Sequence, residues 1–161
     1  MSPRIAFLLS IVLSFAAWSL VAARYVWPRL RALPLPDALR PILLLHSFRF
    51  VGLAFIIPGV VAADLPHAFA QPAAYGDLAT TILALASLAT LHAGAVNFVL
   101  VLTFNVVGAV DLLYAYYQSN ATGLGDNPGL QGAAYFIPTV LVPLLLVTHA
   151  LVFRLLFGRR A

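Results

Sequence analysis

Several side chains capable of acid–base or ligand chemistry stand inside long apolar runs of this sequence. They are His46, Arg49, Asn105, Asp111 and His149. His46 and Arg49 are three residues apart, so a helix would place both on one face. Ionisable groups are costly inside apolar segments and often mark ion or proton pathways there. We therefore take these five residues as a candidate binding site, a buried polar site between helices.

A polar stripe surrounds Asp111. At 100° per residue, six positions fall within an arc of about 140° on one face of a helix. They are Asn97, Asn105, Gly108, Asp111, Ala115 and Gln118. Such a stripe is predicted to face other helices or a wet cavity, because polar groups are costly against lipid. Two interpretations stay open: a hydrogen-bonding helix at the centre of a bundle, and a polar path.

The two histidines allow two kinds of chemistry. His46 and His149 could ligate haem b, with Arg49 pairing a propionate, if both imidazoles faced one cavity. Helix arithmetic places the two at depths that differ by about 6 Å. Alternatively, the His, Asp and Asn side chains could relay protons or admit a small polar solute. The same arithmetic separates Arg49 from Asp111 by about 12 Å in depth, so tilt, Asn105 or water would have to connect them.

The composition indicates a membrane protein. Hydrophobic residues make up 63% of the 161 residues and charged residues 9%, whereas a soluble domain carries about a quarter. All nine cationic residues are arginine, and Lys and Glu are absent. These values exclude an ordinary soluble protein, a disordered chain and a nucleic-acid module. The expected partner of the surface is the lipid bilayer.

Five helical segments are predicted to cross that bilayer. One span takes roughly 20 residues, so residues 78–117 are too long for a single span and must fold back near residues 92–94. The predicted spans are about 5–26, 42–63, 75–91, 95–118 and 133–157. Residues 27–41, rich in proline, are predicted to form a linker that no helix continues through. The predicted fold class is all-α, an integral membrane bundle of five transmembrane helices in one domain, residues 1–161.

The arginines set the predicted orientation. They cluster in the first linker and at the C-terminal end, whereas three aspartates are expected on the opposite side. The residues are Arg24, Arg29, Arg31, Arg40, Arg154, Arg159 and Arg160 against Asp64, Asp77 and Asp126. Arginine favours the cytoplasmic side. The N-terminus is therefore expected outside and the C-terminus in the cytoplasm of a bacterial inner membrane, since the Ala/Leu/Arg composition is typical of bacteria.

Absent residues and motifs narrow the chemistry. Without Cys there is no disulfide, Cys-ligated zinc or iron–sulfur cluster, and without Lys there is no Schiff base. Neither HExxH nor a phosphate-binding loop occurs. No catalytic residue and no metal-ligand set is predicted, and haem b is the one cofactor considered. The residues favour a non-enzymatic role.

Short motifs in four segments carry a resemblance. They are His46-Ser-Phe-Arg49-Phe-Val-Gly52, Tyr75-Gly76-Asp77-Leu78, Phe104-Asn105-Val-Val-Gly108-Ala-Val-Asp111-Leu112, and Ile137-Pro138-Thr139-Val-Leu-Val-Pro143 with Thr148-His149. Through them, residues 42–157 resemble small, uncharacterised bacterial multi-pass inner-membrane proteins, which implies no activity, substrate or cofactor.

The favoured function is that of a proton-linked or small-solute transport protein, alone or as a homo-oligomer. The alternatives are a haem- or quinone-associated redox protein and a structural subunit of a membrane complex.

Overall fold

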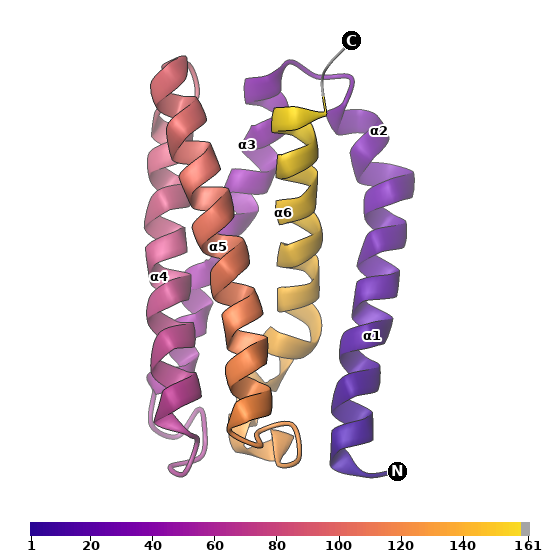
Figure 1. Ribbon diagram of the computed structural model, residues 1–161, viewed down its shortest axis with the longest axis vertical. Coiled ribbons are helices and arrows are strands. Elements are labelled where there is room, and N and C mark those ends of the chain that lie inside the picture. Colours follow the sequence, from indigo (N-terminus) through magenta and orange to yellow (C-terminus); the bar gives the residue numbers. More distant parts are fainter. Residues whose placement is uncertain (159–161) are drawn as a thin grey trace.

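The computed structural model describes residues 1–158 as a bundle of helices that run along one long axis (Figure 1). Within these residues no β-strand forms, so the all-α part of the prediction is confirmed. Arg159 and Arg160, which entered the prediction of orientation, lie outside the described residues. The elements are α1 (Pro3–Val21), the π-helical turn η1 (Ala22–Val26), α2 (Trp27–Leu30), α3 (Leu35–His46), the 3-10 helix η2 (Arg49–Ile56), α4 (His67–Ala89), α5 (Ala95–Ala121), the 3-10 helix η3 (Pro128–Tyr135), the π-helical turn η4 (Ile137–Leu141) and α6 (Val142–Phe157).

Four helical segments of the described chain are long and apolar enough to cross a membrane. They are Pro3–Leu30, Leu35–Ile56, Ala95–Ala121 and Ile137–Phe157. α4 has 23 residues but is not among the four, so the predicted count of five spans is not confirmed. α4 nevertheless lies beside α5 and packs against η2 and α3.

Residues 27–41 had been predicted to form a linker that no helix continues through. Helices form there in spite of the prolines. Pro28 and Pro36 lie in the first turns of α2 and α3, where a missing N–H has no partner within the helix anyway. Pro41 lies inside α3. Only residues 31–34 separate the two helices, and α3 begins at Leu35 rather than near residue 42.

The second predicted span also changes its helix type. After His46 the α-helix gives way to η2, a 3-10 helix of eight residues that ends at Ile56 rather than near residue 63. Runs of 3-10 helix longer than three or four residues are uncommon, and a long one often marks strain or a functional hinge. η2 begins with Arg49.

α4 begins eight residues earlier than the predicted third span, at His67 instead of near residue 75. Neither Pro72 nor Asp77 ends it, because its first turns bury Phe69 and Ala70 against an apolar cluster. Asp77 was predicted to lie on the outer side, and it is instead buried within the helix.

The predicted fold-back near residues 92–94 is confirmed. α4 ends at Ala89 and α5 begins at Ala95, with Gly94 at a φ of 56° between them. The polar stripe of α5 faces the bundle as predicted: Asn97, Asn105 and Gly108 are buried, and Asp111 is half-buried.

Two apolar clusters lie on either side of the bundle's middle. One surrounds Phe104 and includes Leu39, Leu43 and Val152, all at most 1% exposed. The other lies toward the opposite end and includes Phe55, Leu112 and other residues of α4, η4 and α6. The layer between the clusters holds the buried charged side chains described below.

α1 lies at the edge of the bundle. Phe7 is its one buried residue, and it contacts Tyr135 at a ring-centroid distance of 5.9 Å. The Trp18 indole N–H donates to the Val140 carbonyl oxygen at 3.2 Å. α1 therefore packs against η3, η4 and α6 and leaves most of its surface exposed.

Gly132→Ala should lower the free energy of unfolding. Gly132 has a φ of 51° and a ψ of −129°, and an added Cβ would collide with the Val60 carbonyl oxygen. A non-glycine residue in such a conformation costs about 1–3 kcal/mol, before any cost of the collision. Thermal unfolding in detergent measures the loss.

Gly129→Ala is the matched control for Gly132→Ala. Gly129 lies in the same segment, and an added Cβ there meets nothing within 4 Å. Equal stability of the two variants would contradict the assigned conformation of residues 128–135.

Candidate functional site

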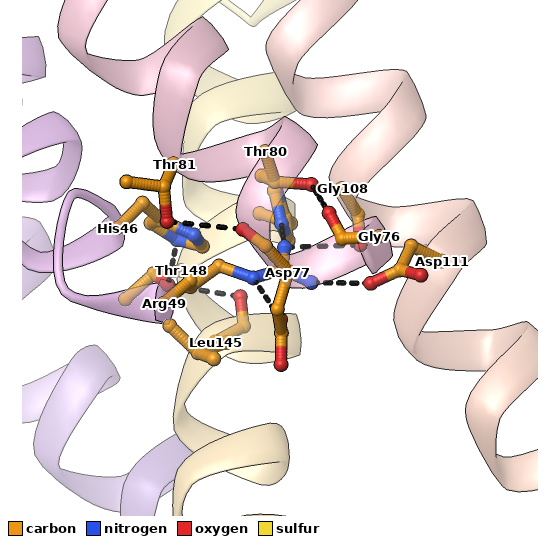
Figure 2. Close-up of polar contacts among 11 residues, drawn as sticks. His46, Arg49, Gly76, Asp77, Thr80, Thr81, Gly108, Asp111, Leu145 and Thr148 are labelled. Atoms are coloured by element: carbon orange, nitrogen blue, oxygen red, sulfur yellow. Dashed lines mark hydrogen bonds and ion pairs between the residues drawn. The ribbon is translucent and has the colours of Figure 1, made fainter. Parts of the chain in front are cut away.

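Arg49 is buried between helices, with 2% of its surface exposed, and its polar contacts are drawn in Figure 2. Its Nε donates to Asp77 Oδ1 at 2.6 Å, and its Nη2 donates to Asp111 Oδ2 at 2.7 Å. η2 supplies the arginine, α4 one carboxylate and α5 the other. One guanidinium thus joins three helices through two charge-assisted hydrogen bonds, the strong kind in a protein interior.

The remaining guanidinium nitrogen fixes the state of His149. Arg49 Nη1 lies 3.3 Å from both the Gly108 carbonyl oxygen and His149 Nε2. A guanidinium only donates, so His149 Nε2 must accept. Its proton is then on Nδ1, which donates to Asn105 Oδ1 at 2.8 Å, while Asn105 Nδ2 donates to the His149 carbonyl oxygen at 3.2 Å. His149 is therefore held as the neutral imidazole.

His46 has one partnered and one unpartnered nitrogen. Its Nε2 lies 2.9 Å from Thr148 Oγ1, and that hydroxyl donates to the Leu145 carbonyl oxygen at 2.9 Å. Thr148 Oγ1 therefore accepts from His46 Nε2–H. His46 Nδ1 is buried and has no hydrogen-bond partner in the described chain, so a free lone pair remains beside the cluster.

Three glycines allow the helices to approach one another at the cluster. An added Cβ at Gly52 would collide with Asp77, and one at Gly76 would collide with Asp111. At Gly108 it would lie 2.6 Å from His149 Cε1 and 2.8 Å from Arg49 Nη1. The charged side chains fill the space that a larger residue would take, which is why glycine stands at these positions.

The charges of the cluster do not balance. Arg49 supplies one positive charge, and Asp77 and Asp111 supply two negative charges when both are ionised. With His149 held neutral, one negative charge is left over in an apolar interior, where unpaired charges are strongly disfavoured. One bound proton would bring the cluster to neutrality.

The structure brings together all five residues that the sequence singled out: His46, Arg49, Asn105, Asp111 and His149. The His46 and His149 rings are 4.3 Å apart between centroids, and Arg49 contacts Asp111 directly. The predicted gaps in depth were therefore wrong. They counted Arg49 from a helix start near residue 42, whereas α3 starts at Leu35 and ends at His46, and Arg49 begins the 3-10 helix η2 beyond it.

Asp77 is the residue of the cluster that sequence reasoning missed. It had been predicted to lie on the outer side, at the start of the span 75–91, and only Asp111 was included in the predicted site. A signal was present, because small residues recur at helical spacing around Asp77 and mark the face on which α4 packs. They are Ala70, Ala73, Ala74, Thr80, Thr81 and Ala84, all buried.

The haem alternative does not fit this geometry. Axial ligation by two histidines requires a macrocycle between the imidazoles, and the His46 and His149 rings contact each other. The Nε2 atoms of both rings are also occupied, one by Thr148 and the other by Arg49.

The fold and site define a helical bundle with a buried arginine–dicarboxylate centre. A model of the family described as Domain of unknown function (DUF8737) matches residues 6–157, so the chain belongs to this family. The match includes every residue of the cluster. No curated protein and no solved structure matches the chain.

The charge imbalance predicts an unequal response to substitution. Arg49→Gln leaves two facing carboxylates without a cation and should cost about 3–5 kcal/mol of unfolding free energy in detergent. Asp111→Asn leaves a balanced Arg49–Asp77 pair and should cost less than about 1 kcal/mol. Replacing both aspartates by asparagine leaves Arg49 unpaired and should cost far more than the sum of the single changes.

Arg40→Gln is the matched control for Arg49→Gln. Arg40 is exposed and lies 3.7 Å from the exposed Asp37, so its loss should change stability by at most about 1 kcal/mol. Adding Asp111→Asn to Arg49→Gln should restore part of the lost stability. Strict additivity of the Arg49 and Asp111 changes would show that the two charges do not interact.

Proposed function

We propose that this chain is a multi-pass membrane protein of the bacterial inner membrane whose Arg49–Asp77–Asp111 cluster binds and releases one proton, in the service of proton-linked or small-solute transport. The single observation that carries the proposal is the count of two buried carboxylates against one arginine, with His149 held neutral. A proton is the smallest species that can cancel the excess charge.

The outer surface supports insertion into lipid. Large apolar side chains are exposed along α1 and α5, among them Leu13, Val99, Val110 and Leu113, each at least 58% exposed. In water such a surface would be strongly disfavoured, whereas in a bilayer it needs no cover. The charged side chains of the cluster, in contrast, are turned inward.

The place of α4 in the bundle supports a fifth span. It connects the end of the bundle that holds residues 57–66 to the end that holds the turn at residues 90–94, and it lies beside α5 (Figure 1). Its 23 residues would extend about 34 Å, enough to cross the hydrocarbon layer. The polar face of α4 is turned away from the surface of the bundle, because Asp77, Thr80 and Thr81 are buried.

The distribution of charge along the axis supports the proposed orientation. α2, the start of α3 and the end of α6 lie at one end of the bundle, and with them Arg29, Arg40 and Arg154 (Figure 1). The N-terminus and Asp126 lie at the other end, where Arg4 pairs with Asp126 at 3.2 Å. Since arginine favours the cytoplasmic side, the Asp126 end would face outward.

A purely structural role for the cluster is the competing interpretation. A packing network would be most stable with balanced charges, as a buried pair is costly unless both partners are matched. The second carboxylate adds a negative charge that packing does not require. Intramembrane carboxylates with such an excess are typical of proton-binding sites.

Reporter fusions should place both arginine-rich segments on the same side of the membrane. Fusions after Arg40 and after Phe157 should both report the cytoplasm, and a fusion within residues 122–127 should report the exterior. This follows if α4 crosses the membrane, because five crossings put the two termini on opposite sides. Opposite signals from Arg40 and Phe157 would contradict the fifth span and the orientation.

Counting protons tests the proposed function directly. Infrared difference spectra between acid and alkaline samples should show one titrating buried carboxyl group in the wild-type protein. Asp111→Asn should show none, because its Arg49–Asp77 pair is neutral without a proton. Arg49→Gln should show two, because both carboxylates then need one.

Asp64→Asn serves as the control for the infrared experiment, since Asp64 is exposed and should leave the buried-carboxyl signal unchanged. A wild-type protein with no titrating buried carboxyl group would leave the cluster as a packing network. The proposed function would then be wrong.

A further inference from the structure

A small cavity adjoins both carboxylates. Its volume is about 20 Å³, and Asp77, Asp111, Tyr116 and Ser119 are among its lining residues. A cavity of this size holds one water molecule, and the carboxylates and hydroxyl groups provide hydrogen-bond partners for it. The cavity lies on one side of the Arg49–Asp77–Asp111 cluster, toward residues 122–127 and the apolar cluster that includes Leu112. Phe104 lies on the opposite side.

An open groove of about 380 Å³ lies on the other side of Tyr116 and Ser119. It runs between α1 and α5, and Arg4, Phe7 and Gly125 help to line it. The small cavity and the open groove share Tyr116 and Ser119 as walls. These two residues therefore form the partition between the carboxylates and the outside.

The partition is polar and thin. Ser119 is 5% exposed and lines both the cavity and the groove. The Tyr116 hydroxyl donates to the Pro138 carbonyl oxygen at 2.9 Å, in the π-helical turn η4. Both hydroxyl groups could bond a passing water molecule after a small side-chain rotation.

The opposite side of the cluster is closed by apolar packing. The Phe104 ring lies 5.0 Å from the His46 ring and 5.2 Å from the His149 ring, between centroids. Beyond it, Leu39 and Val101 are at most 1% exposed and block the route to the basic end. The groove at that end reaches Leu39 and Val101, and no residue of the charged cluster lines it.

We infer that the cluster exchanges with water from one side, the end that carries Arg4 and Asp126, through the partition formed by Tyr116 and Ser119. In that exchange a hydronium ion in the groove gives a proton to the water molecule in the cavity, which gives one of its own protons to Asp111. One O–H bond of the hydronium breaks and one forms on the carboxylate, so the groove water and the cavity water are both left neutral. That the exchanged species is a proton rests on the proposed function, whereas the inference that water reaches the cluster from one side does not.

The absence of cysteine from the sequence makes this access measurable. Single cysteines are placed at Ser119 in the partition and at Ser87 on the closed side. Both serines are buried, Ser119 at 5% and Ser87 at 0% exposure, so the pair is matched in burial. Cysteines at the exposed Asn127 and His92 mark the two ends of the bundle.

Membrane vesicles of both orientations are treated with a small, charged methanethiosulfonate that does not cross membranes. Ser119→Cys should react from the same side as Asn127→Cys. It should react at least about tenfold faster than Ser87→Cys, because a thiol in dry packing waits for local opening. Ser87→Cys should stay unreacted from either side during the time that labels Ser119→Cys.

Reaction of Ser119→Cys from the His92 side, or no faster than Ser87→Cys, would overturn the inference. If Ser119→Cys fails to fold, Ala115→Cys on the cavity wall takes its place with the same expected side. The outcome is separate from that of the proposed function. If Ser119→Cys is labelled but no buried carboxyl group titrates, the access path stands and the proposed proton binding is wrong. If a carboxyl group titrates but Ser119→Cys is not labelled, the access path alone is wrong.

Discussion

The structure depends on one constraint, the satisfaction of the Arg49 guanidinium in the middle of an apolar bundle. A permanently charged group at that place is tolerated only with anionic and hydrogen-bonding partners on several sides. Asp77, Asp111, Gly108 and His149 supply them from α4, α5 and α6. Those helices are thereby held in one register relative to η2. A shift of one turn would move a charge by about 5 Å and leave it unpaired.

The backbone around Arg49 is adapted to this constraint. η2 is a 3-10 helix, narrower than an α-helix, and it carries Gly52 against Asp77. Gly76 and Gly108 let α4 and α5 come close to the same centre. The two apolar clusters on either side of the charged layer exclude water and make each ion pair stronger. The same dry surroundings raise the energetic cost of an unpaired charge, so the one excess negative charge of the cluster is strongly disfavoured.

The proposed proton site follows from charge counting rather than from a motif. Membership of a family described as a domain of unknown function supplies no activity, so the interpretation depends on the geometry. In that geometry Arg49 keeps His149 neutral, and Asp111 stands next to the small cavity. Apolar packing at Phe104 closes one side of the site, whereas on the other side the thin partition at Tyr116 is all that separates the site from the groove.

The sequence by itself determined the class of structure and most of the site. Apolar runs separated by turns require helices packed side by side, and a charged group among them must face inward, so His46, Arg49 and Asp111 could be assigned to the interior from spacing alone. The tertiary structure alone decided the partners. Depth along a helix depends on where that helix starts, and packing overrode the helix-breaking tendency of Pro41 and brought Asp77 inside. Ion pairing acts over a few ångströms, so a change of a few residues in a helix start decides which charges meet.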